Sequence, residues 1–175
     1  EGIRALVIRL MNEQTSYDLE FASDKALLKV GGGKVLSRLI HECRKKGLKG
    51  LDNFVGIPGT VGAAIAGNIG IPREEFGELV ESVTVFDGKQ WRQLTQHDCK
   101  FIYRSSAIRH YHWIVLEAKL IISKGVSPKQ DELLLQRVAK QPKGMSCGSF
   151  FKNPDWKSGV FAGRLIEECG LKGRR

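Results

Sequence analysis

The chain has 175 residues, a formal net charge of +9 and a hydrophobic fraction of 42%. This length allows one domain, or one domain and part of a second, and the apolar fraction is enough for a globular core. The basic excess favours polyanionic partners, which are either nucleic acids or phosphate-bearing small molecules. Aromatic residues are only 8% of the chain and do not alternate with basic ones, so the composition argues against a nucleic-acid binder.

Three segments near the N-terminus have the apolar or alternating pattern of strands, over residues 6–10, 17–22 and 25–30. Three glycines, Gly31 to Gly33, follow, and helical spacing then continues over residues 35–46 up to a stop at Gly47. Strand, glycines and helix in this order are typical of a phosphate loop. The segment lacks the G-x-G-x-x-G and Walker patterns, however, and a purely structural turn is the preferred interpretation.

Residues 53–72 carry no charge. Such a run is consistent with a membrane span, a buried core helix, or a backbone shaped around a ligand. Glycine costs about 1 kcal/mol per helix position relative to alanine, and proline about 3 kcal/mol. The run contains five glycines and the early Pro58, which disfavours a lipid-facing helix. A tight turn that leads into a helix, with exposed N–H groups facing a ligand, fits better, and plain core packing stays the alternative.

The second half of the chain mixes strands and helices. Strands are predicted over residues 80–86, 90–94 and 114–122, with a turn at Asp87 and Gly88 that joins the first two. Residues 123–128 read as a linker, and helices are predicted over residues 132–138 and 163–169. The pattern is neither a βαβ repeat nor an all-β sandwich, so we expect an α+β fold.

The four cysteines are widely spaced and form no C-x-x-C motif: Cys43, Cys99, Cys147 and Cys169. This usage is typical of a reducing cytosol, and no segment resembles a signal peptide, so we expect a cytoplasmic protein that is not in a membrane. A histidine stands two positions before both Cys43 and Cys99. That spacing places the two side chains on different faces of a helix, so we predict no metal site.

Four motifs in order carry a resemblance to a known family. The segment GIPGTVGAAIAGNIG, residues 56–70, resembles the motif GIPGTVGGA…NAGAYG of UDP-N-acetylenolpyruvoylglucosamine reductases, flavoenzymes of bacterial cell-wall synthesis. IYRSSAI (102–108), SCGSFFKNP (146–154) and AGRLIEECGLKG (162–173) are similar to three further motifs of that family. The opening GIRALVIRL (2–10) is also similar, so the resemblance covers nearly the whole chain.

The resemblance implies the FAD-binding fold of vanillyl-alcohol-oxidase-type flavoproteins, in incomplete form, over residues 1–123. The start of an α+β substrate-binding lobe would then occupy residues 124–175. It also implies FAD as cofactor and NADPH as co-substrate. The reaction would be the reduction of UDP-N-acetylglucosamine enolpyruvate to UDP-N-acetylmuramate, an oxidoreductase step in peptidoglycan precursor synthesis. Nothing in the sequence predicts the oligomeric state.

Matching the motifs residue by residue assigns roles to particular side chains. The catalytic candidates are Arg104, a permanent cation for the substrate carboxylate, and Ser149, the proton donor. The cofactor-binding candidates are Ile57, Pro58, Gly59, Thr60, Val61, Gly62, Asn68 and Ile114. The substrate-binding candidates are Tyr103, Lys140 and Asn153. The chain departs from the family pattern at Ala63 and Ala64 and at residues 71–73, so we expect a different turn after Asn68.

The family pattern also includes a GGGSN-type loop for the flavin pyrophosphate and a later half-domain with a catalytic glutamate, and neither has a counterpart in this sequence. We therefore expect an internal fragment or a shortened relative that holds FAD weakly and does not turn over by itself. It should expose apolar side chains around Phe150, Phe161, Leu165 and Ile166. The alternative is a non-catalytic module that binds nucleotides or nucleotide-sugars.

Overall fold

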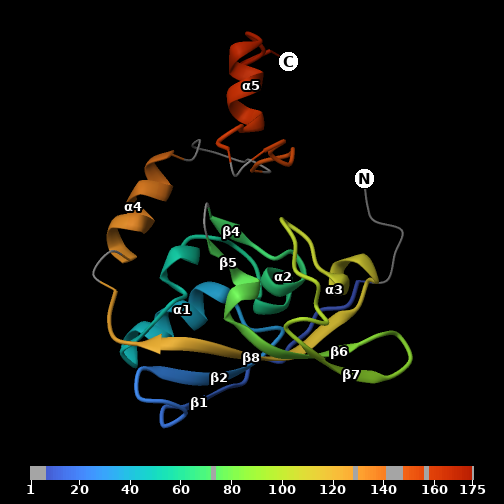
Figure 1. Ribbon diagram of the computed structural model, residues 1–175. Coiled ribbons are helices and arrows are strands. Elements are labelled where there is room, and N and C mark those ends of the chain that lie inside the picture. The colour runs from blue at the N-terminus through green and yellow to red at the C-terminus, as the bar shows by residue number, and fades with distance from the viewer. Residues whose placement is uncertain (1–6, 72–73, 128–129, 141–147, 156–157, 175) are drawn as a thin grey trace.

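The computed structural model describes residues 7–71, 74–127, 130–140, 148–155 and 158–174. A twisted antiparallel sheet with the strand order β1-β2-β8-β6-β7 dominates it, and the short strand β3 also pairs with β8 (Figure 1). Its strands are β1 (Thr15–Asp18), β2 (Lys25–Gly31), β3 (Leu48–Lys49), β6 (Val80–Phe86), β7 (Trp91–Thr95) and β8 (Ile114–Lys124). A second, two-stranded sheet joins β4 (Gly70–Ile71) to β5 (Glu74–Glu75).

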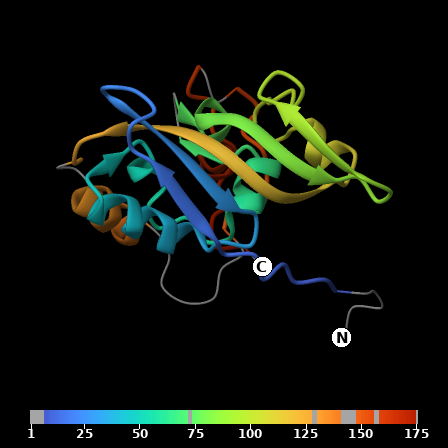
Figure 2. The ribbon, with the colours of Figure 1, turned by 90° about the horizontal axis from the view of Figure 1, so that it is seen from below.

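Helices α1 (Leu36–Lys45) and α2 (Val61–Ala66) cover one face of the main sheet, as the two views in Figures 1 and 2 show. The short helix α3 (Ala107–His110) precedes the central strand β8. Two 3-10 turns, η1 (Asp52–Phe54) and η2 (Phe76–Leu79), flank α2 in the chain. The C-terminal helices α4 (Gln130–Lys140) and α5 (Ala162–Glu168) lie outside this layer (Figure 1). The predicted α+β class is therefore confirmed.

The core lies between the sheet and the two covering helices. Leu28 and Leu120 from the sheet, together with Leu39 from α1 and Ile65 from α2, are all completely buried. These positions follow the alternating pattern of a strand with one covered face and the helical spacing of α1, because only one face of each element meets the other layer. The pairing of β2 with β8 closes the centre of the sheet and joins segments about 90 residues apart, with Leu28 opposite Leu120.

Most of the elements expected from the sequence are present, including α1, the β6–β7 hairpin and β8. The first expected hairpin also forms, but its first strand is residues 15–18 rather than 17–22, because residues 19–24 make the turn. The left-handed backbone of Gly47 ends α1 as expected, with φ +66. The strand predicted over residues 6–10 is wrong for its described part, because residues 7–10 pair with no strand there. Val7 and Ile8 are 75% and 66% exposed. An apolar run signals contact with other apolar groups but does not specify a pairing partner.

The uncharged run does not form one long helix. It folds in turn as η1, a loop, the six-residue helix α2 and the short strand β4. Among the described residues, no helix is both long enough and apolar enough to cross a membrane. Apolar side chains of the expected C-terminal set are exposed, with Phe150 at 83%, Phe161 at 38% and Leu165 at 40%.

The three consecutive glycines allow backbones to meet where side chains would not fit. An added Cβ at Gly32 would lie 2.1 Å from the carbonyl oxygen of Val115, and one at Gly33 would lie 2.6 Å from that of Leu10. The amide of Gly32 donates to the Leu116 oxygen at 2.8 Å, and the amide of Gly62 donates to the Gly32 oxygen at 2.9 Å. We call this contact of Gly31 to Gly33 with the N-terminal segment, α2 and β8 the glycine junction. It confirms the structural interpretation of the glycines.

We predict that Gly32→Ala lowers the free energy of unfolding by at least about 1–3 kcal/mol, the usual cost of forcing extra atoms into a packed site. The added methyl group meets backbone rather than a flexible side chain, so the sheet has to shift. Urea denaturation followed by circular dichroism measures the change. The matched control is Gly163→Ala in α5, where a Cβ meets nothing within 4 Å, and which should be neutral or stabilising. Equal stability of both variants would contradict the junction's role.

Candidate functional site

A groove of about 630 Å³ runs between the N-terminal segment, the glycine junction, α2 and the start of β8. Its walls are mostly apolar, with Ile8 and Leu10 on one side, Ala63 and Ala66 on α2, and Trp113 and Ile114 beside β8. Three of the predicted cofactor-binding residues, Thr60, Gly62 and Ile114, line it. The fold therefore brings together two parts of the predicted cofactor set that are about 50 residues apart in the chain.

The start of α2 is held by the protein itself. The Thr60 side chain accepts a hydrogen bond from the Ala63 amide at 3.3 Å, the usual arrangement of a helix N-cap. The amides of Val61 and Gly62 donate to the oxygens of Lys34 and Gly32, both at 2.9 Å. These two N–H groups are thus already used and do not face a phosphate, contrary to the expectation from sequence. They bind the glycine junction instead and fix α2 at the edge of the groove.

The turn before α2 presents backbone to solvent. Pro58 and Gly59 are exposed, while Ile57 is half-buried and packs against the core. Gly59 has φ +120, a conformation that side chains rarely adopt, and its oxygen accepts from the Leu36 amide at 3.0 Å. The turn is therefore tied to the start of α1 while its outer face stays open.

The groove fits a flat, largely apolar ring system. One wall is made of Gly62, Ala63 and Ala66, whose small side chains let a ring approach the α2 backbone, and the opposite side carries aromatic and aliphatic side chains. Arg9 and Glu13 are the charged residues of its lining. A concave, mostly apolar site with a few polar groups at its edge is the usual form of a cofactor pocket. The residues present therefore fit the isoalloxazine ring of a flavin.

A second cavity, of about 80 Å³, lies where the segment after α2 meets the C-terminal part of the chain. It is lined by Tyr103, Arg104 and Asn153, which are three of the predicted site residues, together with Gly70, Ile71, Glu75 and Phe161. The Asn153 amide nitrogen donates to the Tyr103 hydroxyl at 3.1 Å, and its oxygen accepts from the Ala162 amide at 3.1 Å. Asn153 thus connects the start of α5 to the loop that carries Arg104.

Arg104 is held in an unusual backbone conformation. Its φ is +57, and a non-glycine residue in this region costs about 1–3 kcal/mol, which persists only where the surroundings enforce it. The guanidinium donates to the Gly70 oxygen at 2.5 Å and lies 5.4 Å from the centre of the Tyr103 ring. Two contacts therefore fix its direction within the cavity.

Arg137 on α4 is a second half-buried cation, and the charge of Arg104 acts on it. Burial and the positive charge of Arg104 lower the pKa of the Arg137 guanidinium. The Arg137 stem packs beside Gly56, and its guanidinium donates to the Asn53 oxygen at 3.5 Å. Two half-buried guanidinium groups that repel each other favour an anion between or beside them, because its charge offsets the repulsion. The site is therefore suited to a carboxylate or a phosphate.

The structure does not bring the predicted Ser149 into this cavity. Ser149 is exposed next to the exposed Phe150, and it is not among the residues that line the cavity. Lys140 is the last residue of α4, and its side chain lies outside the described part of the structure. Their roles as proton donor and substrate contact stay predictions.

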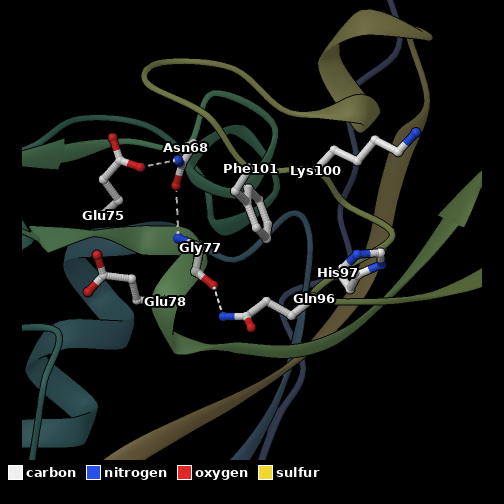
Figure 3. Close-up of a pocket in the computed structure, with 8 residues that line it drawn as sticks. All are labelled: Asn68, Glu75, Gly77, Glu78, Gln96, His97, Lys100 and Phe101. Atoms are coloured by element: carbon white, nitrogen blue, oxygen red, sulfur yellow. Dashed lines mark hydrogen bonds between the residues drawn. The ribbon is translucent and has the colours of Figure 1, made fainter.

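Asn68 has a structural task that the sequence did not reveal. It is completely buried with φ +41, and its amide nitrogen donates to Glu75 at 2.6 Å and to the Ile102 oxygen at 3.0 Å. Its oxygen accepts from the Gly77 amide at 2.9 Å. Figure 3 shows this network beside a cavity of about 340 Å³. Asn68 therefore positions both Glu75 and the loop of Tyr103 and Arg104, and its contact with a cofactor stays a prediction.

Among the described residues, no cluster of three or more histidine, cysteine or acidic side chains is arranged to hold a metal ion. Burial raises the pKa of the Cys43 thiol to about 12 and that of the Cys99 thiol to about 11, so both stay protonated at neutral pH. Cys169 is free and exposed, and Cys147 lies outside the described residues. The two buried cysteines therefore act as small apolar groups of the core.

We predict that Asn68→Gly lowers the free energy of unfolding by about 2–3 kcal/mol, because the Gly77 amide and the Glu75 carboxylate lose a buried partner. Glycine tolerates the positive φ, so the loss isolates the amide rather than backbone strain. Thermal and urea denaturation measure it. Asn53→Ala is the control, since its amide contacts Glu74 near the surface, and it should change stability by much less. A stable Asn68→Gly variant would exclude the positioning role.

Comparisons with known proteins agree with the four motifs. The profile of the family described as "FAD binding domain" matches residues 2–90, and that of "UDP-N-acetylenolpyruvoylglucosamine reductase, C-terminal domain" matches residues 139–175. A UDP-N-acetylenolpyruvoylglucosamine reductase of Clostridioides difficile is 36% identical over 98% of this chain and 56% of its own length. The enzyme of Thermus thermophilus is 36% identical over 100% of this chain and 63% of its own length.

A solved structure shows the same fold. The crystal structure of the reductase (MurB) from Thermus caldophilus superposes with a TM-score of 0.72 at 35% identity, over 84% of this chain and 55% of that protein. The chain thus spans little more than half of the length of the curated relatives named above, 56% and 63%.

Proposed function

This chain belongs to the UDP-N-acetylenolpyruvoylglucosamine reductase family, and we propose that it contributes the flavin-facing side of a reductase. The reaction is the reduction of UDP-N-acetylglucosamine enolpyruvate to UDP-N-acetylmuramate, with FAD as cofactor and NADPH as co-substrate. One observation carries the proposal: a single stretch, residues 60–71, lines both the apolar groove and the Arg104 cavity. A ring in the groove would lie beside residues 60–66 and an anion in the cavity beside Gly70 and Ile71, so consecutive parts of one segment would hold both.

The chemistry needs a hydride carrier and a cation. Bound FAD supplies the two-electron carrier between NADPH and the enolpyruvyl double bond. Negative charge builds on the adjacent carboxylate as that double bond is reduced, and Arg104 with Arg137 offers fixed positive charge to stabilise it. Groups already oriented before the reaction need no rearrangement, and Arg104 is oriented by Gly70 and Tyr103.

Other residues complete the site in this proposal. Tyr103 and Asn153 orient the nucleotide-sugar beside the carboxylate, and Lys140 adds a positive charge for its phosphates. Ser149 delivers the proton that completes the lactyl ether, which requires the segment around it to move into the cavity. Residues 57–62 hold the isoalloxazine edge through the open face of the turn at Pro58 and Gly59.

We assign residues 1–123 to the FAD-binding lobe and residues 124–175 to the start of the substrate-binding lobe. Strand β8 ends at Lys124, close to this boundary. Helix α4 then packs back on the first lobe, where Asp131 forms a bidentate pair with Arg44 at 2.6 and 2.7 Å. In this proposal Arg137 adds a second positive charge near Arg104, so both lobes contribute to the anion site. In this proposal the product is made in the cytoplasm. It is a precursor for peptidoglycan synthesis, which serves cell shape and cell division.

A non-catalytic nucleotide-sugar binding module is the second candidate. The exposed position of Ser149, outside the cavity that holds Arg104, favours it. A module of this kind binds flavin or nucleotide-sugar but does not oxidise NADPH in a substrate-dependent way. A coupled absorbance assay with added FAD and both substrates separates the two candidates, since only the reductase shows turnover proportional to protein concentration.

We predict that Arg104→Ala weakens binding of UDP-N-acetylglucosamine enolpyruvate at least about tenfold, since a charged hydrogen bond contributes about 1.5–3 kcal/mol. Binding of UDP-N-acetylglucosamine, which has no carboxylate, should change much less. Isothermal titration calorimetry measures both ligands. The control is Arg164→Ala on α5, an exposed arginine paired only with Glu168 in the described structure, and it should bind like wild type. An equal loss of affinity for both ligands would contradict the binding of the substrate carboxylate at Arg104.

The half-reactions give a separate prediction for flavin-loaded protein. Arg104→Ala and Ser149→Ala should each slow the oxidation of reduced flavin by substrate by at least about a hundredfold, the usual contribution of a positioned acid or charge. Reduction of the flavin by NADPH should change by less than about threefold, because neither residue serves that step. Stopped-flow absorbance times the two steps independently. A variant that is reoxidised at the wild-type rate excludes the substituted residue from the mechanism.

A further inference from the structure

The apolar groove has one aromatic wall that no sequence motif marked. Trp113 lines the groove next to Ile114, at the point where β8 begins. The ring of Tyr111 stacks on the Trp113 indole, with ring centres 5.0 Å apart and an interplanar angle of 25°. On the same indole, the guanidinium carbon of Arg92 lies 5.9 Å from the ring centre. We call Arg92, Tyr111 and Trp113 the aromatic wall.

Strand β7 and the short connection between α3 and β8 build this wall. Arg92 comes from β7, Tyr111 follows α3, and Trp113 directly precedes β8. His112, between the two aromatic residues, has φ +57, so the chain turns sharply and the rings can stack. The Trp113 amide donates to the Ile108 oxygen at 2.9 Å, which anchors the backbone of the wall to α3.

The guanidinium of Arg92, which is the cation of the aromatic wall, is also held in place. Arg92 donates through Nε to the Asp87 carboxylate at 2.5 Å, and the Asp87 side chain is only 6% exposed. The same carboxylate accepts from the amides of Lys89 and Gln90, both at 2.8 Å. These backbone hydrogen bonds, with Arg92, lower the pKa of Asp87 to about 2, so Asp87 stays charged at neutral pH. Arg92 is therefore held against the indole by the β6–β7 turn.

Core packing accounts for Trp113, which is partly buried against the core, but not for the ring of Tyr111 stacked on it. Tyr111 is 56% exposed, so the stack is at the surface rather than in the interior. Aromatic pairs and exposed cation–aromatic contacts are each weakly favourable. These contributions restrict the indole on its outer side while part of it stays in the lining of the groove. A rigid aromatic surface at the side of an apolar groove is suited to a flat aromatic ligand.

We propose that Trp113 contacts the isoalloxazine ring of the flavin directly, and that Tyr111 and Arg92 are positioning residues that hold its indole in place. This inference rests on the proposed function, because it takes the groove as the flavin site. It goes further in naming the residue that recognises the ring itself. Since the contact involves the ring system, flavins that lack the adenine nucleotide should show it as well as FAD.

The test uses FMN and riboflavin, whose strong emission is quenched when a tryptophan touches the ring. Titration of the wild-type chain should quench bound flavin. Trp113→Leu should leave bound flavin fluorescent and raise the dissociation constant, measured by equilibrium dialysis, at least fivefold. The control is Trp91→Leu on β7, which is 74% exposed and should quench and bind like wild type. Quenching and affinity that survive in Trp113→Leu would overturn the proposal.

A second variant, which should disturb the fold less, separates a defect in flavin binding from unfolding of the protein. Tyr111→Ala removes an exposed ring, so the unfolding midpoint should stay near that of wild type while the dissociation constant rises two- to fivefold. Unchanged affinity in Tyr111→Ala would overturn its positioning role. A wild-type chain that binds neither flavin would instead contradict the groove as a flavin site, and the proposed function would fail with it. Wild-type binding with normal quenching in every variant would contradict only the role of the aromatic wall.

Discussion

The close contact of backbones at the glycine junction is the constraint on which the rest of the structure depends. At Gly32, even one methyl group would lie 2.1 Å from the Val115 oxygen. This approach lets the hydrogen bonds from Gly32 to Leu116 and from Gly62 to Gly32 form together. The start of α2 is thereby fixed against β8, and this fixed position sets the width of the groove between them. Gly32 and Gly33 also line the groove, so the glycines form part of its surface.

The two candidate sites follow from what α2 connects. Its residues Gly62, Ala63 and Ala66 line the groove, and the segment after it passes Asn68 and reaches the cavity of Arg104. The buried amide of Asn68 and the bond from the Ser106 hydroxyl to the Ala66 oxygen, at 2.8 Å, hold the Tyr103 loop to this segment. A displacement of α2 would therefore change both sites at once. Such coupling suits a reaction in which a ring and a carboxylate have to keep a constant distance.

Much of the fold could be predicted from local patterns. The hairpin of β6 and β7 follows from alternating residues around Asp87 and Gly88, and α1 follows from its helical spacing. The unpaired state of Val7 and Ile8 could not be predicted, because an apolar pattern does not distinguish a strand from a groove wall. The short elements α3, β3, β4 and β5 also carry too few residues for a periodic signal.

Only part of the site could be predicted from the sequence, because contacts between residues far apart in the chain leave no local pattern. The motifs identified Arg104, Tyr103 and Asn153, which the fold brings to one cavity. They did not show that the amides of Val61 and Gly62 are used internally, since hydrogen-bond partners distant in sequence leave no local pattern. Glu75 and Arg137 gave no signal, and their positions depend on Asn68 and on the packing of α4. Trp113 had a faint signal, as an aromatic residue directly before a long apolar strand.

The central claim is that the groove beside α2 takes the flavin ring, and filling the groove tests it most directly. Ala63 is exposed and lines the groove, so Ala63→Phe should occupy that space without disturbing the core. Ala139→Phe, an exposed position on α4 away from the groove, is the matched control. Equilibrium dialysis with FMN should show at least a tenfold weaker affinity for Ala63→Phe and wild-type affinity for Ala139→Phe. Equal, undiminished affinity in the two variants would contradict the account.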